Sequence, residues 1–95
     1  MTDPMLLEEW QLAPDVAIRP EPFGALAYDF GTRRLTFLKR PELVSVVTGL
    51  GDHPDVRSAL EASAVPESEW PAYITALQAL ARAGTIRPRR VEALA

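Results

Sequence analysis

The segment GALAYDFGTRRLTFLK, residues 24–39, constrains the fold more than any other part of the chain, because it predicts a β-hairpin in a single register. Gly31 and Thr32 fit a two-residue turn of type II′, which has glycine at its first central position. This turn places Asp29 opposite Arg34, so that two opposite charges face each other across the strands. A shift of one residue would scatter the apolar and charged positions over both faces, so the pattern determines the register.

The same register predicts which hairpin side chains share a face of the sheet. The large apolar side chains fall together, and we expect them to face the core: Leu26, Tyr28, Leu35 and Phe37. If a further strand pairs with the first strand of the hairpin, the backbone of the second hairpin strand is free along its outer edge.

A further strand precedes the hairpin. Val16 and Ile18 alternate with more polar neighbours, and Pro20 and Pro22 are expected to end the strand. Proline cannot donate a hydrogen bond to a ladder, so this strand is expected to lie at the edge of the sheet.

Three helices are predicted after the hairpin. The first begins at Pro41 and ends near Gly49, the second is capped by Asp55, and the third runs from about Ser68 to Gly84. The order predicts an α+β domain of winged-helix type, in which a three-stranded antiparallel sheet is followed by three helices. We expect an N-terminal arm at residues 1–13, the domain at 14–88 and a C-terminal tail at 89–95.

Composition excludes several classes of function. The chain has 95 residues, enough for one modest core. It has no cysteine and a single histidine, His53, so a thiolate metal site and a pair of catalytic histidines are both excluded. It also lacks nucleophile, phosphate-loop and metalloprotease motifs, so we expect no enzyme activity, no metal and no cofactor. The acidic N-terminus and the absence of a long apolar run favour a cytoplasmic protein without a membrane partner.

DNA binding by a winged-helix transcriptional regulator is the alternative. The net charge of −3 argues against nucleic acid, and a recognition helix would need more basic or amide side chains than the second helix offers. Arg87, Arg89 and Arg90 could touch phosphates, but a basic tail is more often simply solvated.

The free edge of the strand RRLTFLK favours a different function. Its ends carry Arg33, Arg34, Lys39 and Arg40, which protect an edge from aggregation or attract an acidic extended peptide. If the Thr36 N–H points outward, Thr36→Pro should abolish peptide binding and leave the domain folded. A free edge could also pair with its own copy in a homodimer.

The chain resembles the PqqD-like peptide chaperones, which are recognition elements of ribosomally made, modified peptides, and within them those of mycofactocin systems. The likeness lies in RPEPFGAL, in YDFGTRRLTFLK and in the helix start PELV, and continues more loosely through the helix from Trp70 to Gly84. It covers most of the chain from about residue 14.

The resemblance implies a non-catalytic domain that binds the leader of the mycofactocin precursor peptide by strand addition and presents it to a radical S-adenosylmethionine (SAM) enzyme. In this family the leader pairs with the third strand and leans on the third helix, and the mycofactocin leader is acidic. Carried onto this chain, the likeness implies a strand side made by Arg34, Leu35, Thr36, Phe37 and Leu38. It implies a helix side made by Tyr73, Ile74, Leu77, Gln78, Ala81 and Arg82.

Overall fold

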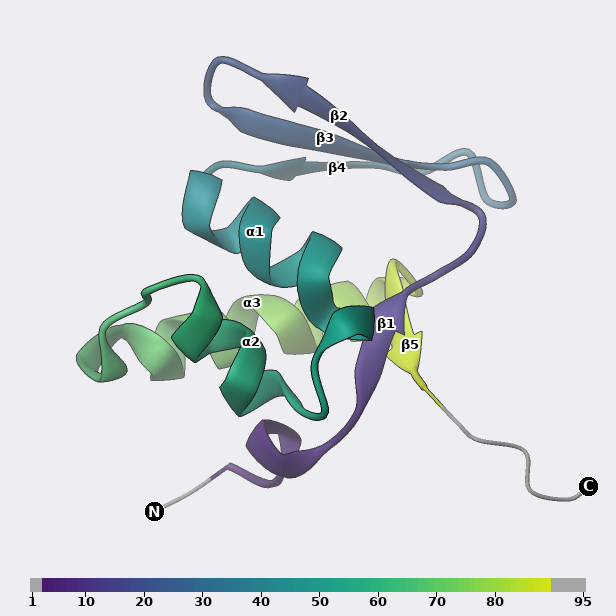
Figure 1. Ribbon diagram of the computed structural model, residues 1–95. Coiled ribbons are helices and arrows are strands. Elements are labelled where there is room, and N and C mark those ends of the chain that lie inside the picture. The colour runs from purple at the N-terminus through teal and green to yellow at the C-terminus, as the bar shows by residue number, and fades with distance from the viewer. Residues whose placement is uncertain (1–2, 90–95) are drawn as a thin grey trace, which may run out of the picture.

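The computed structural model describes residues 3–89 and confirms the α+β architecture. A three-stranded antiparallel sheet of order β2-β3-β4 lies at one end of the molecule, α1 lies beneath it, and α2 and α3 lie below α1 (Figure 1). The strands of this sheet are β2 (Val16–Glu21), β3 (Gly24–Asp29) and β4 (Leu35–Leu38). The helices are α1 (Pro41–Gly49), α2 (Val56–Ala62) and α3 (Trp70–Ala83).

The hairpin has the predicted register, but its turn differs from the predicted one. Ala25 pairs with Leu38, and the Asp29 N–H donates to the Arg34 carbonyl at 2.9 Å. The predicted type II′ turn is wrong, because the connection is a four-residue loop that ends at Arg33 in the left-handed conformation, with φ 62°.

Asp29 organises this loop through its own backbone and side chain. Its carbonyl accepts the Arg33 N–H at 2.7 Å, and its carboxylate accepts the N–H groups of Gly31 and Thr32 at 2.8 and 3.1 Å. Carboxylates commonly hold turns in this way. The register survives because a four-residue loop and a two-residue turn both place Asp29 opposite Arg34.

The predicted core face of the hairpin is wrong. Leu35 and Phe37 are 57% and 59% exposed, whereas Ala25, Ala27 and Leu38 on the opposite face are buried. The alanines face inward, where the sheet packs on α1, and their small side chains let the two layers approach closely. The larger apolar residues are therefore left on the outer face of the sheet.

Strand β2 continues through Pro20 to Glu21 instead of ending at that proline. The Phe30 N–H donates to the Asp15 carbonyl at 2.9 Å, so Asp15 directs its backbone toward the next strand. Backbone groups alternate in direction along an antiparallel strand, so Pro20 directs its nitrogen away from β3 and costs no ladder bond. The predicted edge position of this strand is confirmed.

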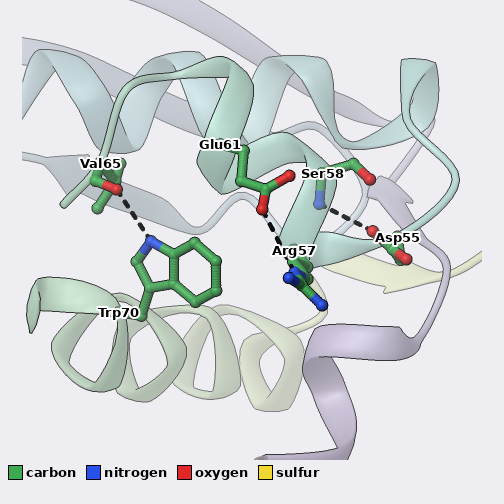
Figure 2. A network of polar contacts seen from close by, with 6 residues as sticks. All are labelled: Asp55, Arg57, Ser58, Glu61, Val65 and Trp70. Atoms are coloured by element: carbon green, nitrogen blue, oxygen red, sulfur yellow. Dashed lines mark hydrogen bonds and ion pairs between the residues drawn. The ribbon is translucent and has the colours of Figure 1, made fainter. Parts of the chain in front are cut away.

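The helix ends follow the sequence signals. The Asp55 carboxylate accepts the Ser58 N–H at 2.8 Å and caps α2, and Gly84 ends α3 with φ 82°. Figure 2 shows this cap, together with the Trp70 indole N–H, which donates to the Val65 carbonyl at 3.0 Å. This last bond anchors the start of α3 to the chain that leaves α2.

The N-terminal segment packs onto the body through elements that the sequence patterns did not predict. A 3₁₀ turn, η1 (Pro4–Leu7), buries Met5. Strand β1 (Trp10–Leu12) pairs antiparallel with β5 (Ile86–Pro88), so both ends of the described chain meet in a small second sheet. No helix within residues 3–89 is long and apolar enough to cross a membrane.

Candidate functional site

Strand β4 carries an open hydrogen-bonding edge. Asp29 and Arg34 form a hydrogen-bonded pair, so Thr36 and Leu38 direct their backbone groups toward β3 as well. Leu35 and Phe37 direct theirs away from the sheet. Within residues 3–89, no backbone hydrogen bond outside the strand ladders ends on either residue. Because the Thr36 N–H points toward β3, the condition set for the Thr36→Pro variant, an outward N–H, is not met.

The outer edges of β2 and β5 are interrupted by prolines. In β2 the outward positions include Pro20, as described above. In β5 the Thr85 carbonyl and the Arg89 N–H bind the facing strand at 2.9 Å each, so Pro88 lies at an outward position. A proline there cannot donate to an added strand, whereas β4 has no proline at its outward positions. Strand β1 packs against α1 and against the short 3₁₀ turn η2 (Leu50–Asp52). The backbone of β4 is thus the edge best suited to accept a guest strand.

A groove of about 340 Å³ runs beside this edge. It is lined by Leu43 at the start of α1 and by Ala72, Tyr73 and Ala76 of α3. Phe37, Lys39 and Arg40 line the side nearest β4. The groove is mostly apolar in its side chains and basic at one end, and it suits an extended segment that carries apolar and acidic residues.

Positive charge flanks the open edge at both ends. Arg33 and Arg34 precede β4, and Lys39 and Arg40 follow it, all four exposed. Arg40 approaches Glu69 at 3.7 Å, and no ion pair within the described residues engages the other three. An acidic ligand would meet Arg33, Arg34 and Lys39 without first displacing a partner that belongs to residues 3–89.

The residues expected on the helix side do not all face this groove. Tyr73 does, although its side chain is buried. Leu77 is fully buried in the core. The remaining four residues lie on the opposite side of α3, against the N-terminal segment: Ile74, Gln78, Ala81 and Arg82.

This opposite side of α3 carries two hollows of about 620 and 430 Å³. Ile74 and Gln78 line the larger one with Leu6 and Leu7, and the Gln78 amide donates to the Asp3 carboxylate at 3.3 Å. The contact shows that part of the helix face expected for a ligand is already engaged by the chain's own N-terminal segment.

Sequence reasoning missed three groove residues, Leu43, Ala72 and Ala76. The spacing of Ala72, Tyr73 and Ala76 at i, i+1 and i+4 places them on one side of a helix. That spacing was a usable signal, because two alanines beside an aromatic residue leave room for a neighbouring chain. It was masked by the stronger apolar stripe that includes Ile74 and Leu77.

The carboxyl group of Asp55 has a shifted pKa because it caps α2. Hydrogen bonds from Ser58 lower the pKa of Asp55 below its usual range, as a helix cap would. Within residues 3–89, no three histidine, cysteine or acidic side chains gather as a metal site requires.

Comparisons with known proteins agree with a peptide-handling role. The model of the "Peptide chaperone MftB family" matches residues 9–87. The chain is 51% identical over 83 residues to the "Peptide chaperone MftB" of Mycobacterium ulcerans, covering 87% of this chain and 76% of that protein. It is 48% identical over 81 residues to that of Mycobacterium tuberculosis, covering 85% and 74%. The protein of Mycolicibacterium smegmatis is 49% identical over 83 residues, covering 87% and 81%. No solved structure gives a significant match.

Proposed function

This chain belongs to the peptide chaperone MftB family, and we propose that it binds the leader of the mycofactocin precursor peptide as an added strand on β4. It is a carrier without catalytic activity, and it presents the bound precursor to a radical SAM maturase. The observation that carries this proposal is the outward backbone of Leu35 and Phe37, which lies beside the apolar groove and pairs with no other backbone in the described part of the chain.

Binding has three physical components. The guest backbone exchanges hydrogen bonds with Leu35 and Phe37, and its inward side chains enter the groove beside Tyr73. Exposed Arg33, Arg34 and Lys39 attract acidic residues of the leader and raise the rate of encounter. Residues Leu35 to Phe37 thus form the strand side, and Ala72, Tyr73 and Ala76 form the helix side.

The leader is ordered only when it binds, so part of the interaction free energy is spent on ordering it. We expect a binding free energy of about −8 to −12 kcal/mol, which corresponds to dissociation constants from micromolar to nanomolar. An affinity in this range lets the carrier hold the precursor and still release it to an enzyme.

Isothermal titration calorimetry tests the proposal directly. The protein is titrated with the synthetic precursor peptide, with its leader alone and, as a control, with duplex DNA. We expect saturable one-to-one binding to both peptides and none to DNA. Salt-sensitive binding to DNA without peptide binding would indicate the winged-helix regulator instead.

The handover needs a second measurement, because leader binding alone does not show it. The radical SAM maturase is assayed with the precursor in the presence and absence of the chaperone. We expect modification of the precursor to depend on the chaperone. A maturase that works equally well without it would refute the carrier role and leave peptide binding intact.

A further inference from the structure

The outer face of the β2-β3-β4 sheet carries an unusual concentration of exposed apolar side chains. Within residues 3–89, five large apolar side chains stand exposed, and four of them belong to this sheet and its loops: Phe23, Phe30, Leu35 and Phe37. Exposed apolar residues gathered on one face commonly mark a binding surface.

These side chains form one connected surface. The rings of Phe23 and Phe37 meet edge to face with centroids 5.8 Å apart, and those of Tyr28 and Phe30 meet at 4.7 Å. The cross-strand pairs Leu26–Phe37 and Tyr28–Leu35 join the two ends. We call this surface the outer apolar face, made by Phe23, Leu26, Tyr28, Phe30, Leu35 and Phe37.

A strand added to β4 must place part of its own side chains on this face. Side chains alternate between faces along a strand, and neighbouring strands keep the same alternation. The guest residue level with Thr36 therefore points to the side of the sheet that packs on α1, and the residues level with Leu35 and Phe37 point to the outer apolar face. This holds for a parallel and for an antiparallel guest.

We infer that the outer apolar face is a second half of the leader site, and that the chaperone recognises its guest strand from both sides. This inference rests on the proposed function and specifies its ligand. The recognised segment has three consecutive apolar residues, the middle one on the side of α1 and α3 and the outer two against Leu35 and Phe37. Acidic residues flank the triplet, where Arg33 and Arg34 lie at one end and Lys39 and Arg40 at the other.

Charge favours a peptide over a second copy of the chain as the occupant of this edge. Two β4 strands paired antiparallel about Thr36 would bring Arg33 of one copy opposite Lys39 of the other. Like charges directly opposite each other in a sheet are unfavourable. An acidic peptide makes the same main-chain hydrogen bonds, and its charges attract Arg33 and Lys39 instead of repelling them.

Disulfide mapping tests the geometry, and the chain is suited to it because it contains no cysteine. Leu35→Cys and Phe37→Cys variants are each mixed with synthetic leader peptides that carry one cysteine at successive positions. A thiol redox buffer lets the best-aligned pairs accumulate as disulfides, which form when Cα atoms lie about 4.4–6.8 Å apart. Leu7→Cys is the matched control, because Leu7 is an exposed apolar residue of η1, outside the outer apolar face.

We expect the preferred leader positions for Leu35→Cys and Phe37→Cys to differ by two residues, with no preference for Leu7→Cys. Serine at either position of the unlabelled leader should weaken calorimetric binding about tenfold, as serine at the intervening position should. If serine is tolerated within twofold at both outer positions while the leader binds and the intervening position matters, two-sided recognition is refuted and strand addition stands. If the unmodified protein binds no leader at all, the proposed function fails, and this inference fails with it.

Discussion

The direction of each backbone N–H along β4 makes a strong prediction about proline substitutions. Leu35 points its N–H away from the sheet and is 57% exposed, so Leu35→Pro removes no ladder bond and little buried surface. Thr36 points its N–H at β3, so Thr36→Pro removes a bond to Ala27 and drives the pyrrolidine ring toward that strand. Neighbouring prolines should therefore have opposite effects on folding and on binding.

The magnitudes follow from burial. Ala27 is only 2% exposed, so losing the partner of its carbonyl costs about 1–3 kcal/mol before any ring clash is counted. A chain of 95 residues has a total stability on the order of 5–14 kcal/mol, so Thr36→Pro should destabilise the domain severely. Leu35→Pro should cost about 1 kcal/mol or less, and it should weaken leader binding at least tenfold because the ring occupies the position of the guest backbone.

Urea unfolding followed by tryptophan fluorescence measures the first effect, and calorimetry with the leader peptide measures the second. Leu35→Ala is the matched control, because it removes the same side chain and keeps the N–H. The reasoning is refuted if Leu35→Pro binds the leader as well as Leu35→Ala does. It is also refuted if Thr36→Pro unfolds at the same urea concentration as the unsubstituted protein.

Three further predictions concern charge, a glycine and a helix cap. The double variant Arg34→Glu, Lys39→Glu should weaken binding of an acidic leader about tenfold at low salt, and progressively less toward 1 M salt. The control Arg82→Glu should not weaken binding, because Arg82 lies on the other side of α3. Equal effects in both variants would contradict the proposed site. Gly24→Ala should destabilise the domain by about 3 kcal/mol or more in urea unfolding, because Gly24 has φ +148° and an added Cβ would overlap the Leu38 carbonyl oxygen. Gly31→Ala should have a mild effect, because an added Cβ there would meet only side-chain oxygens. Asp55→Ala should cost about 1 kcal/mol at neutral pH through loss of the cap. Because the pKa of Asp55 is lowered in the folded state, its contribution is complete above the ordinary value of 3.8 and is lost as the pH falls below it, so the stability difference between the two proteins should shrink by pH 3.

Local sequence signals predicted the elements of the fold well. The hairpin register, the cap at Asp55 and the end of α3 at Gly84 were all read from neighbouring residues. These features depend on hydrogen bonds and side-chain contacts within a few positions, which a short sequence pattern records completely.

The pairing of β1 with β5 could not be read in this way. Both strands have only three residues. Trp10, near the start of the described chain, pairs with Pro88, near its end. Neither segment has the length or the alternation that marks a strand on its own. Only the packed helices bring the two ends together.

For the candidate site too, local sequence predicted one part and the tertiary structure decided the other. The sequence by itself determined that RRLTFLK contains a hairpin strand flanked by basic residues, because its pairing across a short loop and its charges are local. The tertiary structure decided that Ala25 and Ala27 face α1 while Leu35 and Phe37 remain outside, and that Tyr73 rather than Gln78 faces the groove. A strand makes the same ladder hydrogen bonds whichever of its faces packs on the core. Which face is buried therefore depends on how closely a helix distant in the sequence can pack against it, and that distance is set only in the folded chain.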